Sequence, residues 1–303
     1  MKNLRIMYMG TPDFASYILD KLISDGYNVT SVVTKVDAKK DRGQKVKFSA
    51  VKETAVNHGL TVYQPETLKD NAFMEILEVE KPDMIIVAAY GKILPPYIIS
   101  YPKYGCINVH ASLLPKYRGS APIQYAVLKG EKESGVTTML MDNGLDTGDM
   151  LVKKSVSITD EDTGGSLHDK LMEIGYSALS ETIENIETIK PVPQDESLMT
   201  YAPPIKKEET VIDFSENAKD IINKIRGFYP FPGTSFTLNG NSYKIHKAEF
   251  FSDKDNGGYG EVEEFTKNGL KIKAKGGIIN ILELQPAGKR KMSIADFYNG
   301  NKL

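Results

Sequence analysis

LRIMYMGTPDFASYILDKLI, residues 4–23, is the stretch that decides how this chain begins to fold. Residues 4–9 are apolar and stop at Gly10, Thr11 and Pro12, which predicts a short buried strand followed by a tight loop. Asp13 stands where it would cap a helix over residues 14–23. The stretch therefore predicts a unit made of one strand, one loop and one helix.

The same unit recurs through the first half of the chain. Strands are expected at 29–34, 61–63, 84–89, 106–110 and 135–141, and helices at 49–57, 71–80 and around 167–186. The unbroken apolar run at 84–89 is typical of a central parallel strand. This alternation predicts an α/β, Rossmann-like fold, in which a mostly parallel sheet carries helices on both faces.

Two domains joined by a linker are expected from the length of 303 residues. The first covers residues 1–189. Residues 190–204 form an extended linker, because four prolines stand there among polar residues. Residues 205–303 have a helix near 218–226 and then short alternating runs with turn signals such as Asn239-Gly240. This second pattern predicts a small, OB-like C-terminal β-barrel.

The composition excludes several classes of protein. A net charge of −2 is far from that of a polycation that coats nucleic acid, so any nucleic-acid contact must be local. No apolar run reaches the 18 or so residues of a membrane span, which predicts a cytoplasmic protein with no membrane partner. A single cysteine, Cys106, excludes an intrachain disulfide, and four scattered histidines make a metal site unexpected.

Asn108 and His110 are the first candidates for chemistry. They lie two residues apart on an expected strand, so they point to the same face of the sheet. The ends of buried strands in α/β sheets are where such folds place active sites. A lone histidine in a core is more often structural, but the neighbouring amide and the turn at residues 112–115 favour a functional role.

An acidic, glycine-rich loop, DNGLDTGDM at residues 142–150, supplies the next candidate, Asp146. Its carboxylates lack the spacing of an EF-hand calcium loop. The loop after Gly10 likewise lacks the second and third glycines of a dinucleotide fingerprint, which argues against a nicotinamide cofactor. Two glycines that permit close backbone approach favour a binding loop over a plain turn.

Taken together, NVHASLLPKYRG at 108–119 and GLDTGDM at 144–150 resemble the signature of the folate-dependent formyltransferases. GTPDFA at 10–15, APIQ at 121–124 and LQPAGK at 284–289 narrow the resemblance to the branch that formylates methionine esterified to initiator tRNA. The resemblance covers essentially the whole chain. It implies 10-formyltetrahydrofolate as donor, methionyl initiator tRNA as partner, a role in translation initiation, and no metal.

By motif position, the resemblance implies that Asn108, His110 and Asp146 are the catalytic trio. It assigns the folate-contacting turn to Ser112, Leu113, Leu114 and Pro115. Ala89 and Tyr90 are added as folate neighbours because they follow the expected central strand. In the expected mechanism, Asn108 and His110 stabilise negative charge on the formyl oxygen, and Asp146 helps remove the proton of the amine.

Basic residues are the candidate tRNA contacts. They are Lys39, Lys40, Arg42 and Lys45 in the loop at 35–47, and Lys271, Lys273, Lys289 and Arg290 in the second domain. VDAKK at 36–40 departs from the Pro-Asp-Arg start more usual in the family, which leaves individual roles in this loop open. The alternative for the lysines of the second domain is a solvated strand edge.

Two other functions remain open at this stage. The trio is shared by formyltransferases that act on a small amine, such as a ribonucleotide or an amino sugar. Small barrels also occur in RNA-binding modules without catalysis. Cys106 is interpreted as a packing residue, because an unactivated thiol stays protonated.

Overall fold

The structure is a computed structural model that describes residues 1–40, 45–255 and 257–300, with the backbone alone for residues 38–40 and 45–46. The chain divides into two compact units. The first unit comprises Met1–Gly119, Gly135–Val156 and His168–Tyr201. The second comprises Ser120–Ser134, Ser157–Leu167 and Ala202–Leu303.

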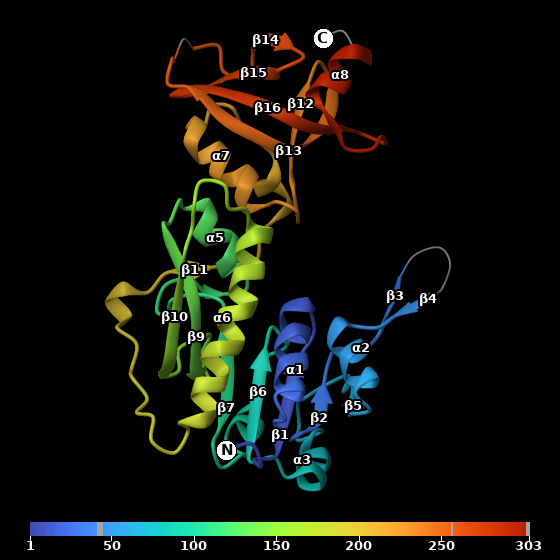
Figure 1. The fold of residues 1–303 in the computed structure, drawn as a ribbon, viewed down its shortest axis with the longest axis vertical. Helices are drawn as coiled ribbons and strands as arrows, with labels where there is room; N and C mark the ends of the chain where they lie inside the picture. Colours follow the sequence, from blue (N-terminus) through green and yellow to red (C-terminus); the bar gives the residue numbers. More distant parts are fainter. Residues whose placement is uncertain (41–44, 256, 301–303) are drawn as a thin grey trace. The chain divides into compact units, whose positions relative to one another are not determined.

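A seven-stranded sheet forms the centre of the first unit, in the order β10-β9-β7-β6-β1-β2-β5 (Figure 1). Its strands are β1 (Ile6–Gly10), β2 (Val29–Val33), β5 (Thr61–Tyr63), β6 (Met84–Ala88), β7 (Cys106–His110), β9 (Glu133–Leu140) and β10 (Met150–Ser157). The pairings from β5 through β7 are parallel, and β9 is antiparallel to β7. The predicted mostly parallel sheet is confirmed.

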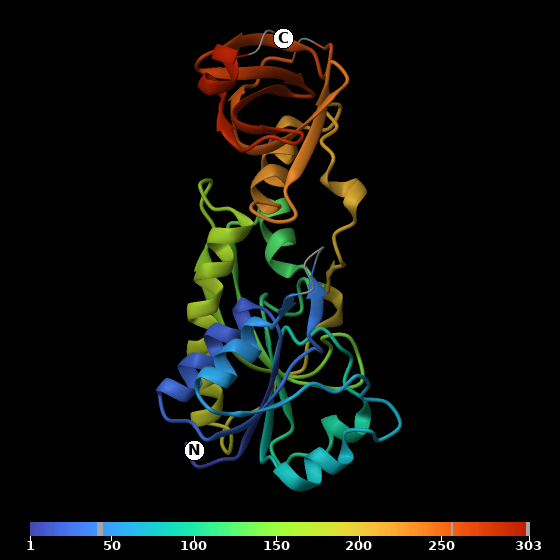
Figure 2. The same cartoon turned by 90° about the vertical axis from the view of Figure 1, so that its right-hand side faces the viewer.

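Helices cover both faces of this sheet, as expected. They are α1 (Asp13–Ser24), α2 (Ala50–Asn57), α3 (Met74–Glu80), α4 (Pro96–Ile99) and α6 (Gly164–Glu184). Figure 2 shows α1, α2 and α6 on one face and α3 and α4 on the other. A Cβ atom on Gly175 of α6 would lie 3.4 Å from Phe14 and 3.6 Å from Ile18, so the glycine lets α6 pack closely against α1.

Two expected helix starts are wrong. Pro12, not Asp13, is the N-cap of α1, and the Asp13 carboxylate accepts from the adjacent Phe14 N–H instead. The helix expected from residue 71 begins at Met74, because Asp70 and Asn71 adopt left-handed backbone angles with φ of 53° and 57°. Short polar side chains tolerate that conformation, and composition alone does not reveal it.

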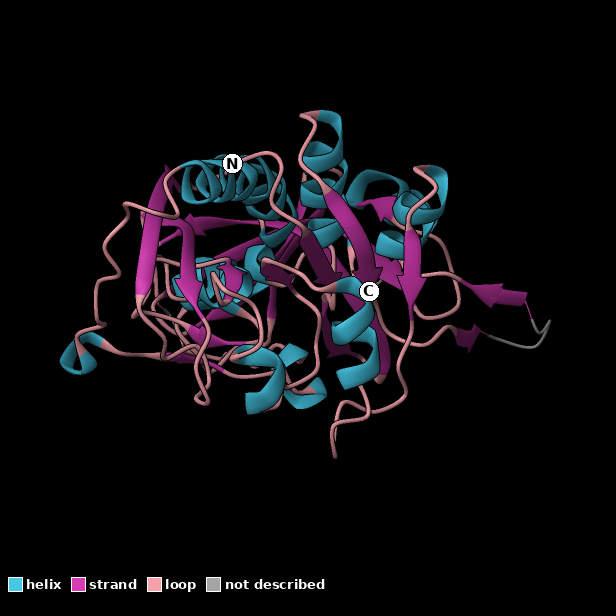
Figure 3. Cartoon of the chain, turned by 90° about the horizontal axis from the view of Figure 1, so that it is seen from below, coloured by secondary structure: helices cyan, strands magenta, loops and turns pink. Residues whose placement is uncertain are grey.

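Smaller elements complete the first unit. β3 (Ala38–Lys40) and β4 (Lys45–Lys47) pair as the antiparallel hairpin drawn at the right of Figure 3. β8 (Arg118–Gly119) and the 3₁₀ helix η1 (Glu196–Leu198) follow later in the chain. Ser49 caps α2 by accepting from the Lys52 N–H at 3.1 Å, as its hydroxyl suits it to do.

The second unit is an antiparallel sheet that curls on itself, consistent with the predicted small barrel (Figure 2). Its elements are α5 (Pro122–Leu128), η2 (Lys207–Thr210), α7 (Ala218–Gly227), β12 (Thr234–Leu238), β13 (Asn241–Ser252), β14 (Val262–Thr266), β15 (Gly269–Ala274), β16 (Gly277–Pro286), β17 (Met292–Ser293) and α8 (Ile294–Gly300). The short strand β11 (Tyr201–Ala202) lies at the boundary, with Tyr201 in the first unit and Ala202 in the second. Asn239 and Gly240 form the β12–β13 turn with positive φ, as their residue types predict.

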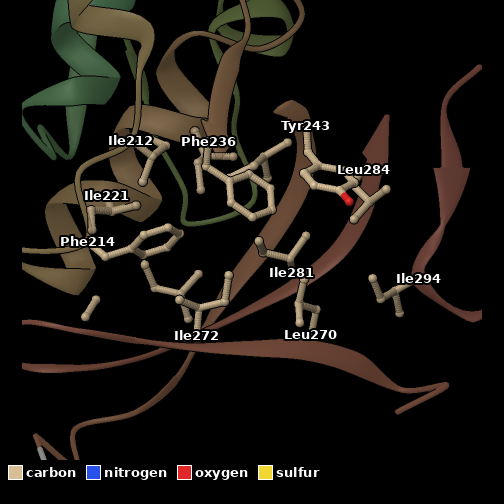
Figure 4. Packing of buried hydrophobic residues seen from close by; sticks show 14 of the residues in the cluster. Ile212, Phe214, Ile221, Phe236, Tyr243, Leu270, Ile272, Ile281, Leu284 and Ile294 are labelled. Carbon is tan, nitrogen blue, oxygen red and sulfur yellow. The ribbon is translucent and has the colours of Figure 1, made fainter. Parts of the chain in front are cut away.

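Aromatic side chains hold the core of this unit together (Figure 4). Phe236 is 2% exposed and packs at right angles to Phe214, with ring centroids 5.9 Å apart. It also contacts the Tyr243 ring at 5.4 Å. Ile281 and Leu284 of β16 close the same cluster from the facing strand. Along β12, buried Thr234 and Phe236 alternate with less buried residues, so one side of that strand faces the core, whereas the first five residues of β16 are all buried.

We expect Phe236→Ala to lower the free energy of unfolding by about 3–5 kcal/mol, because it removes a buried ring and leaves a cavity. Thr237→Ala, the exposed neighbour on β12, should change it by less than about 0.5 kcal/mol. Urea unfolding of the full chain measures both. Equal effects of the two variants would contradict the assigned register of β12.

Candidate active site

The carboxyl end of β7 positions the first two candidate residues. Asn108 is half-buried and lies opposite Val87 of the parallel strand β6. His110 is 6% exposed and lies opposite Thr137 of β9. Both side chains share one face of β7, as the two-residue spacing predicts.

Asp146 reaches this pair from the loop between β9 and β10. Its Oδ1 accepts a hydrogen bond from Asn108 Nδ2 at 3.3 Å, and its Oδ2 lies 3.6 Å from His110 Nδ1. Oδ2 also accepts from the backbone N–H of Gly119 at 2.9 Å. The structure thus brings together three residues that span 38 positions of sequence. Gly119 is a fourth member of the site that its residue type alone does not reveal.

The hydrogen bonds of His110 define its protonated nitrogen. Nε2 lies 3.0 Å from the carbonyl oxygen of Tyr117, and a carbonyl can only accept, so Nε2 carries a hydrogen. The other ring nitrogen, Nδ1, faces the Asp146 carboxylate. When Nδ1 is protonated as well, the ring is a cation whose charge the nearby carboxylate balances.

The Asp146 loop has a backbone that few side chains tolerate. Asp146 itself adopts a left-handed conformation with φ of 54°, which Asp and Asn tolerate better than most other side chains do. A Cβ atom on Gly148 would lie 1.7 Å from the carbonyl oxygen of Leu140, so only glycine fits there. Gln194 donates to the carbonyl oxygens of both residues at 2.8 Å. The sequence gives no sign of this contact, because Gln194 lies in the expected linker.

Hydrogen bonds to Thr137 of β9 stabilise the turn after β7. Thr137 Oγ1 donates to the Ser112 carbonyl oxygen at 2.7 Å and accepts from the Leu114 N–H at 3.1 Å. Ser112 and Leu114 are 1% exposed, Pro115 is buried, and Leu113 is half-buried. Any ligand at this turn would therefore meet its backbone and Leu113 before the other side chains.

Ala89 and Tyr90 follow β6 as expected and differ in environment. Ala89 is exposed, with φ of 44°. The Tyr90 ring belongs to the core, and its hydroxyl has no hydrogen-bond partner among the described residues. Burial raises the pKa of Tyr90 to about 12, so the phenol stays neutral. Only Ala89 presents a surface to a ligand here.

Cys106, at the start of β7, is a packing residue in the structure. Its side chain is 1% exposed within the core cluster, and its Sγ lies 3.5 Å from the Ile98 carbonyl oxygen. Burial raises the pKa of the Cys106 thiol to about 12, which keeps it protonated. This agrees with the interpretation drawn from its apolar neighbours.

The candidate tRNA contacts of the first unit lie in and around the β3–β4 hairpin. Lys39, Lys40 and Lys45 lie on the β3–β4 hairpin, whereas Arg42 lies outside the described residues.

In the second unit, Lys271 pairs with Glu264, and Lys273 pairs with Glu261 at 2.9 Å. These carboxylates reduce the positive field of that strand face. Lys289 and Arg290 are exposed.

A cavity of about 620 Å³ in the second unit was not expected from the sequence. Its lining includes the lysines at 206, 207 and 244 and the aromatic ring of Phe231, which is 78% exposed. The Lys206-Lys207 pair and the FYPFP run at 228–232 are the sequence signals that mark it. A ring and several cations around one hollow are suited to nucleic acid.

Two other features, a membrane-spanning helix and a metal-binding cluster, are absent from the described residues. None of the helices in the described part of the chain combines the length and apolar character needed to cross a bilayer. Within the same residues, no group of three or more His, Cys, Asp and Glu side chains is arranged to hold a metal ion.

Solved structures share the fold. HypX from Aquifex aeolicus in complex with tetrahydrofolic acid superposes with a TM-score of 0.64 at 18% identity, over 97% of this chain and 46% of that one. An N-formyltransferase from Helicobacter canadensis, in complex with folinic acid and dTDP-3-aminofucose, gives 0.69 at 23% identity, over 93% and 99%. At these identities the likeness establishes the fold alone.

Sequence relatives are much closer. The methionyl-tRNA formyltransferase of Caldanaerobacter subterraneus subsp. tengcongensis is 48% identical over 99% of this chain and 98% of its own length. That of Dictyoglomus thermophilum is 45% identical over 99% and 98%. The formyl transferase family model matches residues 2–183, and the model of the formyl transferase C-terminal domain matches residues 204–302. The chain therefore belongs to the formyl transferase family, within the group whose curated members are methionyl-tRNA formyltransferases.

Proposed function

We propose that this protein transfers the formyl group of 10-formyltetrahydrofolate to the α-amino group of methionine on initiator tRNA, with Asn108, His110 and Asp146 as its catalytic residues. The meeting of these three side chains at the end of β7 carries the proposal. The two family models and the full-length relatives support it. Such a reaction belongs with the translation machinery of the cytoplasm.

The reaction sets three tasks. The amine nitrogen forms a bond to the formyl carbon while the bond from that carbon to N10 of the folate breaks. The amine loses one proton, and N10 gains one. In between, negative charge develops on the formyl oxygen and has to be stabilised. The exchange of C–N bonds takes place between the two substrates, and the protein assists it by proton transfer and hydrogen bonding, which side chains can supply.

The geometry suggests how the trio divides these tasks. An amide carries two N–H donors, of which Asn108 gives one to Asp146, and we assign the other to the formyl oxygen. His110 uses Nε2 on the Tyr117 carbonyl oxygen, so its donor to the same oxygen is the protonated Nδ1. Asp146 balances that charge, receives the amine proton directly or through a water molecule, and relays a proton to N10 as the bond from N10 to the formyl carbon breaks.

The donor would lie between the end of β6 and the turn after β7. The exposed Ala89 backbone and the half-buried Leu113 border this region, at the strand ends where α/β sheets bind their ligands. The folates in the structures of HypX and the Helicobacter canadensis enzyme, which share this fold, are consistent with a folate-derived donor. No metal has a part in this scheme.

The acceptor arm would contact the basic hairpin and the second unit. We assign the main contacts in the second unit to the cavity with Lys207, Lys244 and Phe231, because cations can follow phosphates while the ring stacks on a base. Lys289 and Arg290 are added contacts. Lys271 and Lys273 contribute less, since each already has a carboxylate partner.

Formyl transfer from 10-formyltetrahydrofolate should occur to methionyl initiator tRNA and stay near background with free methionine or an amino-sugar nucleotide. A radiolabelled donor with the acceptors run side by side measures this. Transfer to a small amine alone would keep the trio but replace the acceptor. Absence of transfer to every acceptor would favour a non-catalytic RNA-binding module.

Asn108→Ala, His110→Ala and Asp146→Ala should each lower kcat by about 10²–10³-fold, because each removes a group that acts on the developing charge or the proton. Asn143→Ala, exposed in the same loop as Asp146, is the matched control and should retain the wild-type kcat. Single-turnover rates and thermal melting give the comparison. A well-folded member of the trio with normal kcat has no catalytic role.

Lys207→Ala and Lys244→Ala should each weaken tRNA binding and reduce the slope of log K against log salt by about one. Phe231→Ala should cost about 1–3 kcal/mol of binding free energy through loss of stacking. Lys271→Ala, whose ammonium pairs with Glu264, is the comparison variant. Filter binding over a series of salt concentrations tests this, and a larger loss in Lys271→Ala than in Lys244→Ala would refute the assignment.

A further inference from the structure

The proline-rich segment at residues 191–200 is bonded to both halves of the candidate active site, and we call it the strap. Val192 exchanges two backbone hydrogen bonds of 2.8 Å with Met150, at the end of the Asp146 loop. The Thr200 carbonyl oxygen accepts from the Arg118 N–H at 2.9 Å, and Thr200 Oγ1 accepts from the Tyr117 N–H at 2.9 Å. The strap therefore belongs to the first unit and is bonded to both signature segments.

Gln194, in the middle of the strap, uses all four hydrogen-bonding positions of its amide. Its Nε2 donates to the carbonyl oxygens of Asp146 and Gly148, both at 2.8 Å. Its Oε1 accepts from Nε and Nη2 of Arg118, at 3.0 and 2.7 Å. A guanidinium can only donate and carbonyls can only accept, so this network permits one orientation of the amide. Gln194 is thereby a fixed link between Arg118 and the Asp146 loop.

Arg118 is itself held firmly. Its side chain is 1% exposed, and its Nη1 and Nη2 donate to the two carboxylate oxygens of Glu196 at 3.1 and 2.7 Å. These hydrogen bonds lower the pKa of Glu196, so its carboxylate stays ionised beside the guanidinium. The guanidinium hydrogen bonds to Gln194 and Glu196 fall two residues apart on the strap, so the buried Arg118 is a rigid anchor for that segment.

Two residues from different stretches of the chain hold Asp146, one at its carboxylate and one at its carbonyl oxygen. The N–H of Gly119, the residue after Arg118, donates to the Asp146 carboxylate, while Gln194 holds the Asp146 carbonyl. The carboxylate and the backbone of a residue in a left-handed conformation are thus both fixed. Catalysis is sensitive to such placement, since a displacement of about 1 Å can cost on the order of 100-fold in rate.

We propose that Gln194, oriented by Arg118, is a positioning residue that sets the place of Asp146 beside His110 and Asn108. This inference rests on the proposed role of Asp146 in formyl transfer and adds to it a residue outside the motifs of the family signature. Gln194 acts on the reaction only through the Asp146 loop. The competing interpretation is that the network merely stabilises the first unit.

Two variants of Gln194 separate its two contacts. Gln194→Leu removes both, whereas Gln194→Glu keeps an acceptor for Arg118 and places a carboxylate oxygen against the carbonyls of Asp146 and Gly148. Both should lower kcat by roughly 10- to 100-fold, with KM for donor and tRNA changed by less than about threefold. Asp195→Asn, also on the strap but bonded to Ser197, is the control and should behave as wild type.

A double-mutant cycle with Asp146→Ala distinguishes positioning from general stabilisation. If Gln194 acts through Asp146, Gln194→Leu should have almost no further effect on the single-turnover rate in that background. Additive losses in the cycle, or a wild-type kcat in Gln194→Glu, would overturn the proposal. If the wild-type protein is inactive with every acceptor, that result contradicts the proposed formyl transfer, but it does not contradict the structural link between Gln194 and the Asp146 loop.

Hydrogen exchange tests the link between Gln194 and the Asp146 loop without an activity assay. Hydrogen exchange of the peptide spanning residues 143–149 should be faster in Gln194→Leu and Gln194→Glu than in the wild type and Asp195→Asn, because the loop loses two of its hydrogen bonds. Unchanged exchange in both Gln194 variants would show that the loop is held without Gln194.

Discussion

The carboxylate of Asp146 is the group on which the rest of the candidate site depends. Its two oxygens contact the Asn108 amide, the His110 imidazole and the Gly119 N–H, which come from different parts of the first unit. A carboxylate that is partly shielded from water interacts strongly with such donors and is costly to leave without them. The position of this one loop residue therefore decides whether a carboxylate lies beside both Asn108 and His110.

The sheet supplies the frame for that arrangement. β7 holds Asn108 and His110 on one face, between the parallel strand β6 and the antiparallel strand β9. β9 runs antiparallel to β7, with Thr137 opposite His110 and Leu140 opposite Ile107, so the loop after β9 starts beside the beginning of β7. This loop then turns back and places Asp146 beside Asn108 and His110. A rigid, buried sheet thus fixes two members of the site, and the short Asp146 loop delivers the third.

Charge pairing changes how the basic residues of the second unit are interpreted. The regularly spaced lysines of β15 look like a nucleic-acid surface in sequence, but carboxylates from β14 and the turn before it meet Lys271 and Lys273. Lysines at the cavity lie beside an exposed ring instead. Local pairing, more than the number of basic residues, decides where a phosphate backbone is attracted.

The sequence by itself determined the alternating α/β pattern, the antiparallel second domain and the three candidate catalytic residues, because periodicity, turn residues and a local motif are written in neighbouring positions. It missed Arg118 and Gln194 as parts of the site, and it missed the cavity around Phe231. It also placed the starts of α1 and α3 wrongly: Pro12 is the N-cap of α1, and the left-handed backbone angles at Asp70 and Asn71 delay the start of α3. Only the tertiary structure decided these points, because contacts between residues 76 positions apart, such as Arg118 with Gln194, leave no local pattern.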